Sequence, residues 1–271
     1  MEENNVAVSL IASRIRSIAY WVATVIIVLE SAAGSEWDLT HNQYVKDVFT
    51  HLGYPLYLLT ILGVWKLLAA IVLIIPRFPK VKEWAYAGLF FAYSGGAISQ
   101  LAIGSSGDAW GPFIFAGITV ASWFLRPPSR CLTIQSEQPE EKTKEKKWRL
   151  IIYWVATGLL ALGMLQSGIF AALRTKQWID LVTALGYPVY FLTILGVWKI
   201  LGVIAILVPG FKLVKEWAYA GFFFAMTGAL ASHLACSDYS IKGIIGPLFQ
   251  TAFIIFSWYF RPANRKIISV E

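Results

Sequence analysis

Residues 52–76 read LGYPLYLLTILGVWKLLAAIVLIIP, and residues 185–209 read LGYPVYFLTILGVWKILGVIAILVP. The two stretches are identical at 16 of 25 positions, and residues 81–92 match residues 214–225 at 11 of 12 positions. Both comparisons use the same offset of 133 residues and need no gap, so chance similarity is excluded. The chain therefore contains two copies of one unit.

The similarity extends toward both ends of each copy. The run Tyr20 to Thr24 recurs as Tyr153 to Thr157, and each copy closes on an Arg-Pro pair. Two additional residues precede Gly246, so equivalent positions after that point differ by 135. A polar, highly charged stretch between the copies predicts a solvated linker. We expect three parts: a first repeat at 1–127, a charged linker at 128–147 and a second repeat at 148–271.

The composition predicts a membrane protein rather than a soluble one. Apolar residues make up 57% of the 271 and charged residues only 14%, whereas a soluble domain usually carries about a quarter charged residues. A transmembrane helix needs roughly 20 mostly apolar residues. We therefore predict an all-α polytopic protein with four transmembrane helices in each repeat. The expected spans are 15–34, 55–75, 84–103, 110–126, 150–170, 188–208, 217–236 and 244–260.

The basic residues predict the orientation of these eight spans in the membrane. Along eight alternating spans, 17 Lys and Arg fall on one side of the membrane and four on the other. By the positive-inside rule both termini and the linker are cytoplasmic, as in a multi-pass protein of the cell membrane, with the bacterial inner membrane as the expected location. The net charge of +7 then reflects topology and contact with anionic membrane lipids, and no nucleic-acid partner is expected.

The even number of spans in each repeat has a second consequence. Both repeats enter from the cytoplasm, so they are parallel four-helix bundles related most simply by a pseudo-two-fold axis along the membrane normal. This arrangement excludes the inverted repeats of many transporters. A fused homodimer of four-helix bundles is the simplest ancestor.

Several motifs recur in the same order in both copies. They are GYP at 53–55 and 186–188, LGVWK at 62–66 and 195–199, and KEWAYAG at 82–88 and 215–221. With these motifs the chain resembles the DoxX-like family of small membrane proteins, here as a tandem copy. That family takes its name from relatives that form part of a thiosulfate:quinone oxidoreductase. The resemblance therefore implies quinone as a cofactor and a membrane or redox protein as a partner.

One lysine lies in the middle of an expected span in each repeat, and we call Lys66 and Lys199 the interior lysines. Each is about ten residues, or about 15 Å, before a proline that ends its helix, which is half of a roughly 30 Å hydrocarbon core. A charge at that depth costs about 2.5 kcal/mol or more, so each side chain should face the bundle and find a partner. The hypotheses are a site for an anion or a quinone head group, a proton relay, or a tie between two helices.

A carboxylate at a similar depth occurs in the first repeat only. Glu30 is about 14 residues, or about 21 Å, beyond Arg16, so we expect it to pair with Lys66. Gly163 occupies the equivalent position in the second repeat, and Lys199 must find another partner or a ligand. This asymmetry indicates that the second half holds the open site.

Four further polar residues are candidates. Gln100 and its equivalent His233 follow a face of small residues on the third helix of each repeat, as hydrogen-bonding core residues or, for His233, as a proton carrier or ligand. Glu83 and Glu216 open the same helices, where an acidic residue complements the helix dipole. Pairing of these two carboxylates with the interior lysines is a strained alternative.

Motifs for common chemistry do not occur in the sequence. It contains no Cys-x-x-Cys, no glycine-rich nucleotide loop and no recognisable Ser-His-Asp spacing, and residues 35–53 favour an amphipathic segment over a metal site. We expect a non-catalytic module that binds a small amphiphile, a lipid or a partner protein within its bundles, with no intrinsic cofactor. The alternatives are a membrane subunit of a quinone-linked oxidoreductase and small-solute transport.

Overall fold

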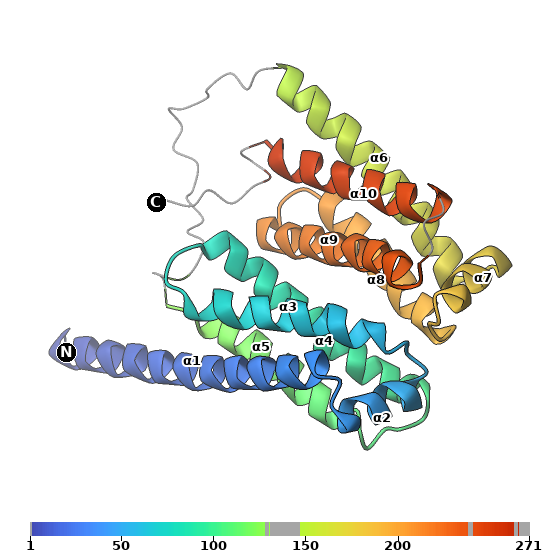
Figure 1. The fold of residues 1–271 in the computed structure, drawn as a ribbon. Helices are drawn as coiled ribbons and strands as arrows, with labels where there is room; N and C mark the ends of the chain where they lie inside the picture. The colour runs from blue at the N-terminus through green and yellow to red at the C-terminus, as the bar shows by residue number, and fades with distance from the viewer. Residues whose placement is uncertain (1, 128–129, 131–146, 238–240, 263–264, 266–271) are drawn as a thin grey trace. The chain divides into compact units, whose positions relative to one another are not determined.

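A computed structural model describes residues 2–127, 130, 147–237, 241–262 and 265, and every regular element in these residues is a helix (Figure 1). The all-α prediction is confirmed. Most of the predicted linker lies outside the described residues. The helices are α1 (Glu2–Leu39), α2 (Gln43–Leu52), α3 (Tyr57–Ile74), α4 (Pro79–Ala102) and α5 (Trp110–Leu125), then α6 (Lys147–Ala172), α7 (Lys176–Ala184), α8 (Tyr190–Leu207), α9 (Lys212–Ala235) and α10 (Ile241–Tyr259).

Each expected span falls on one of these helices. Among the described residues, five helices are long and apolar enough to cross a membrane, namely α1, α3, α6, α8 and α9. The apolar parts of α5 and α10 are shorter, and α4 carries buried polar residues along its length, such as Ser94, Ser99 and Gln100. Five candidate membrane spans are therefore shown, while a topology of eight transmembrane helices remains a prediction. The short helix α2 lies within residues 35–53, where an amphipathic segment is expected, and the short helix α7 was not expected.

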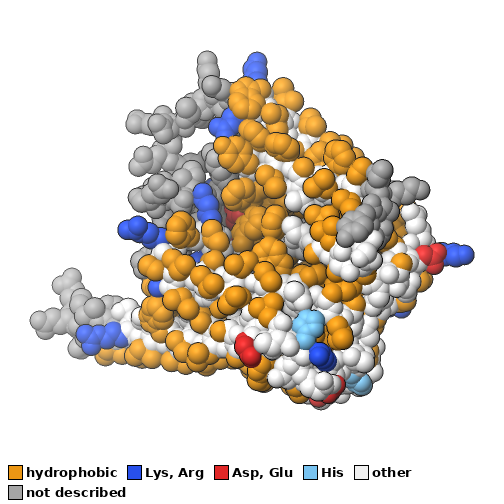
Figure 2. Space-filling view, viewed as in Figure 1, with side chains coloured by type: hydrophobic (Ala, Val, Ile, Leu, Met, Phe, Trp, Pro, Cys, Tyr) orange, Lys and Arg blue, Asp and Glu red, His pale blue; other side chains and the backbone are white. Residues whose placement is uncertain are grey.

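Large apolar side chains point outward along the long helices. Leu162 and Phe124 are 68% and 69% exposed, and hydrophobic side chains dominate the face seen in Figure 2. Soluble monomers rarely expose contiguous apolar patches beyond a few hundred Å². These side chains contact lipid in a bilayer, so the exposed surface supports the membrane class that the composition indicates.

Packing divides the chain into two compact units whose bounds differ from those of the sequence repeats. Unit 1 contains Met1–Trp37 and Gly63–Leu132, and unit 2 contains Asp38–Leu62 and Thr133–Glu271. In unit 1, hydrogen bonds join α1 to each of the other three long helices. The bonded pairs are Thr24 with Ser122 of α5 at 2.8 Å, Ser31 with Tyr93 of α4 at 3.1 Å, and the Ser35 hydroxyl with the Gly63 carbonyl of α3 at 2.8 Å.

Unit 2 contains a four-helix bundle. Helix α6 packs against α8 and α10, and α9 packs against the same two helices. The interior is closed by large side chains that are at most 1% exposed, including Tyr153, Met164, Ile206 and Tyr219. Tyrosine in this interior brings a hydroxyl that needs a hydrogen-bond partner. Tyr219 satisfies that need through the Ser257 hydroxyl at 2.6 Å.

The repeated segments 52–57 and 185–190, which contain the Gly-Tyr-Pro motifs, explain why residues 38–62 belong to unit 2. The Tyr57 hydroxyl donates to the Leu185 carbonyl at 2.6 Å, and the Tyr190 hydroxyl donates to the Leu52 carbonyl at 2.8 Å. Each of these bonds is the repeat equivalent of the other, at the offset of 133. Gly53 ends α2 with a φ of 74°, a backbone conformation that glycine adopts without steric cost, and its equivalent Gly186 has a φ of 79°. The repeated motif thus forms a reciprocal contact inside unit 2.

Gly196 sets how closely α6 and α8 approach. A Cβ on this residue would lie 2.6 Å from the Ala172 nitrogen and 2.7 Å from the Gly168 carbonyl oxygen. We predict that Gly196→Ala lowers the free energy of unfolding by about 1–3 kcal/mol, because backbone atoms cannot move aside as a flexible side chain can. The measurement is the melting temperature of the purified protein in detergent.

The matched control is Gly158→Ala on α6. A Cβ there meets no atom within 4 Å, so the melting temperature should stay unchanged or rise slightly, since alanine favours a helix over glycine. Equal effects of the two substitutions would show that the close approach at Gly196 is wrong.

Candidate functional site

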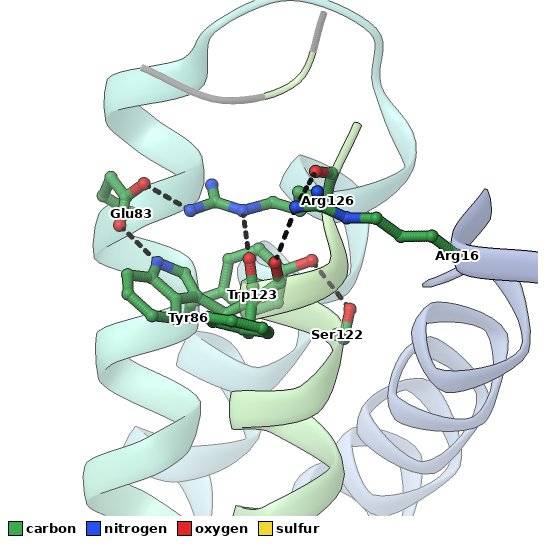
Figure 3. Close-up of polar contacts among 7 residues, drawn as sticks. Arg16, Glu83, Tyr86, Ser122, Trp123 and Arg126 are labelled. Atoms are coloured by element: carbon green, nitrogen blue, oxygen red, sulfur yellow. Dashed lines mark hydrogen bonds and ion pairs between the residues drawn. The ribbon is translucent and has the colours of Figure 1, made fainter. Parts of the chain in front are cut away.

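A buried ion pair joins the start of α4 to the end of α5 (Figure 3). Arg126 Nη2 lies 2.5 Å from Glu83 Oε1, and the two side chains are 3% and 0% exposed. Trp123 Nε1 donates to the other carboxylate oxygen at 2.7 Å, and Arg126 Nε donates to the Trp123 carbonyl at 2.9 Å. Both oxygens of the carboxylate therefore have a donor, which a buried carboxylate requires.

Hydroxyl groups extend this cluster toward α1. The guanidinium of Arg126 lies over the Tyr86 ring, 5.0 Å from its centroid, and the Tyr86 hydroxyl is 2.9 Å from the Ser122 hydroxyl. Ser122 in turn is bonded to Thr24 of α1 at 2.8 Å. Tyr86, Ser122 and Thr24 thus form one chain of polar contacts through α4, α5 and α1, and Figure 3 draws its Tyr86–Ser122 contact.

The neighbouring lysine secures the end of α3. Lys82 is 1% exposed, and its ammonium donates to the carbonyl oxygens of Val72 at 2.7 Å, Leu73 at 3.2 Å and Ile75. The last carbonyls of a helix have no partner within the helix, and a cation near them opposes the negative end of the helix dipole. Lys82 and Glu83 together therefore attach α4 to the ends of both α3 and α5.

The second repeat reproduces this arrangement contact by contact. Arg261 Nη2 lies 2.6 Å from Glu216 Oε1, and Trp258 Nε1 donates to the other oxygen at 2.8 Å. Lys215 donates to carbonyl oxygens near the end of α8, those of Ala205, Ile206 and Val208. Preservation of every partner in both copies indicates a role in holding the helices together.

The interaction expected from the sequence for Glu83 and Glu216, namely with the dipole of their own helix, was wrong. Neither carboxylate lies in the first turn of its helix, where it would complement the dipole. Each is the acidic partner of an arginine 43 or 45 residues further along the chain, and each bonds that arginine and a tryptophan. Sequence spacing could not reveal these partners, because only the packing of α4 on α5 and α9 on α10 brings them together.

In unit 1 the side chains of Glu30 and Lys66 both lie beside Gly34 of α1. A Cβ built on Gly34 would lie 3.4 Å from Glu30 Oε1 and 3.4 Å from Lys66 Nζ. The carboxylate of α1 and the ammonium of α3 thus flank the same glycine. An acidic and a basic group at this position give the interior of unit 1 a charge-balanced centre.

The interior lysine of unit 2 has neutral neighbours instead. Lys199 is 7% exposed; its ammonium donates to the Ser167 hydroxyl of α6 at 3.3 Å and lies over the Trp178 ring of α7, 5.2 Å from the centroid. In the part of the chain that the structure describes, no carboxylate pairs with Lys199. Among the described residues, the groups that solvate its positive charge are the Ser167 hydroxyl and the Trp178 ring.

A glutamine occupies the space that the missing carboxylate leaves. A Cβ on Gly163 would lie 1.8 Å from Gln250 Nε2, so the carboxamide of α10 occupies the space that a side chain at position 163 would need. Gln250 Oε1 is buried and has no hydrogen-bond partner among the described residues. Sequence reasoning missed both Gln250 and Ser167. Alignment of the two repeats could have revealed them, because the first repeat has Phe115 in place of Gln250 and Gly34 in place of Ser167.

The other predicted candidates lie near the ends of α4 and α9. Gln100 is 7% exposed and its Oε1 has no hydrogen-bond partner among the described residues, while His233 is 4% exposed in the last turn of α9. No group of three or more His, Cys, Asp or Glu that could hold a metal occurs in the described residues. Cys236 is a free, exposed thiol, and Cys131 lies outside the described residues.

Long apolar helices, apolar side chains on the outside and charged groups buried among the helices define a helical integral membrane protein. The chain belongs to the DoxX-like family, whose model matches it twice, over residues 22–122 and again over residues 155–258. The double match agrees with the tandem duplication that the sequence predicts. No curated protein and no solved structure matches the chain.

Loss of one partner of a buried ion pair leaves an uncompensated charge. We therefore predict that Arg261→Met lowers the free energy of unfolding by about 3–5 kcal/mol, measured as a fall in melting temperature in detergent. The double variant Arg261→Met with Glu216→Leu should recover most of the loss, because neither charge of the pair is left buried without its partner. A single variant as stable as the unaltered protein would exclude a structural role for the pair.

Proposed function

We propose that the protein is a non-catalytic membrane module that binds a small amphiphile in its second bundle, with Lys199 contacting an anionic or carbonyl head group. The observation that carries the proposal is the buried ammonium of Lys199, whose partners are the Ser167 hydroxyl and the Trp178 ring. A cation away from water is costly unless an opposite charge or several acceptors compensate it. A negatively charged or carbonyl oxygen supplies that compensation.

The first bundle supports this proposal by contrast. Lys66 shares its place with the Glu30 carboxylate, so an intramolecular anion is already near it. Loss of this carboxylate at Gly163, with the lysine retained at Lys199, leaves the second bundle a charge that a ligand can balance. An amphiphile suits the site because the bilayer supplies it directly and its tail can lie along the exposed apolar helices.

Quinone is one ligand of this class. Its carbonyl oxygen accepts a hydrogen bond from an ammonium, and the relatives that name the family motivate its inclusion. As a quinone-linked subunit the protein would rely on a partner protein for the redox group. The ligand experiment below therefore includes extraction of quinone.

We also propose that the chain crosses the membrane eight times with both termini in the cytoplasm. Each of the eight expected spans falls on a helix of at least 16 residues, and the reciprocal bonds of Tyr57 and Tyr190 support a pseudo-two-fold relation between the repeats. A reporter fused after Pro139, which lies outside the described residues, should stay in the cytoplasm. Export of the reporter would overturn this topology.

The binding proposal predicts that Lys199→Met removes a co-purifying ligand. Native mass spectrometry of the purified protein, together with analysis of a solvent extract for quinone and lipid, should show a bound amphiphile in the unaltered protein and at least a tenfold loss in the variant. A matched control neutralises the first bundle with Glu30→Gln and Lys66→Met and should retain the ligand. A ligand retained by Lys199→Met, or lost equally in the control, would refute the site.

A further inference from the structure

We propose that Gln250 is the second recognition residue of the Lys199 site, and that the ligand head group carries a hydroxyl or amine donor beside its anionic or carbonyl group. This inference rests on the proposed function and deepens it. It assigns a chemical class to the ligand: an amphiphile whose head contains both an acceptor for Lys199 and a donor for Gln250.

Three differences between the bundles occur together around one place. Glu30 is replaced by Gly163, Gly34 by Ser167, and Phe115 by Gln250. In unit 1, Phe115 is an apolar neighbour of the Tyr93 ring, with the centroids 5.7 Å apart. In unit 2 the equivalent helix instead presents a carboxamide. The carboxylate and the ammonium that flank Gly34 in the first bundle are thus exchanged for one cation and two neutral hydrogen-bonding groups.

The geometry places these groups along one face of α6. Gln250 lies against Gly163, and the Lys199 ammonium is bonded to Ser167, which is four residues further along the helix. Four residues correspond to about 6 Å along the helix axis, so the two sites of contact are about one turn apart. A single small head group can therefore reach both the ammonium and the carboxamide.

The chemistry of the carboxamide decides what the ligand must supply. Gln250 Oε1 is a buried acceptor, and no hydrogen bond to it is formed within the described residues. Leaving such an acceptor unsatisfied costs about 1–3 kcal/mol, and glycine at position 163 is what permits the amide to lie there. Lys199 donates only, so it selects an acceptor, while Gln250 Oε1 selects a hydroxyl or amine hydrogen.

The test uses two probes of the same charge and tail, one with and one without hydroxyl donors in its head group. Dodecyl methyl phosphate and dodecyl glyceryl phosphate carry the same tail and the same single negative charge, but only the second carries free hydroxyl groups. Binding of each probe to the purified full-length protein in detergent is measured for the unaltered chain, Gln250→Met and Lys199→Met. Melting temperatures without probe establish that each variant is folded.

The unaltered protein should bind the glyceryl probe about two- to tenfold more tightly, the range expected for one hydrogen bond. Gln250→Met should remove this preference and leave affinity for the methyl probe unchanged. Lys199→Met should weaken both probes at least tenfold. As a second variant, Gln250→Glu should also weaken both probes, because a carboxylate in the same site competes with the phosphate for Lys199.

The possible failures are distinguishable. A preference for the glyceryl probe that persists in Gln250→Met, or no preference in the unaltered protein, overturns the role of Gln250 and leaves the proposed function standing. Unchanged binding in Lys199→Met overturns the proposed function and this inference with it. No binding of either probe to the unaltered protein overturns this inference, and the ligand experiment on Lys199→Met then decides the proposed function, which also includes a carbonyl head group.

Discussion

The buried Glu-Arg pair at the end of each bundle is the interaction on which the arrangement of the long helices depends. Its carboxylate lies in the chain directly after a lysine, and the two side chains reach in different directions. Lys82 bonds the last carbonyls of α3, while Glu83 bonds Arg126 at the end of α5. A buried charge tolerates little displacement of its partner, so these bonds hold three helix ends in register. Unit 2 repeats the same solution with Lys215, Glu216 and Arg261.

Because this framework is duplicated, the bundle interiors are free to differ. The first interior keeps an acidic and a basic group together at Gly34, which balances its charge within the protein. The second keeps only the lysine and adds the hydroxyl of Ser167 and the amide of Gln250. A framework held at the helix ends can accommodate this exchange, since the end contacts do not involve the interior lysines. The half that we propose to bind a ligand is therefore the one in which, among the described residues, no carboxylate accompanies the interior lysine.

Several parts of this description were predictable, and particular residues show why others were not. Lys66 and Lys199 stand out in any apolar stretch because charge is rare at that depth. Ser167 and Gln250 are ordinary polar residues in the sequence, and only the structure relates them to Lys199. Glu83 was assigned to the wrong partner, since a nearby helix start is visible in sequence while Arg126 is 43 residues away. The grouping of residues 38–62 with unit 2 was equally hidden, because it depends on the tyrosine bonds of Tyr57 and Tyr190.

The sequence by itself determined the duplication, the helical class, the membrane environment and the loss of one interior carboxylate, because repeats, apolar stretches and rare charges are local properties of the chain. Tertiary structure alone decided which charges are paired, which helix ends they hold and which groups surround Lys199. Those contacts join residues tens of positions apart, and their strength comes from burial, which exists only after the helices have packed.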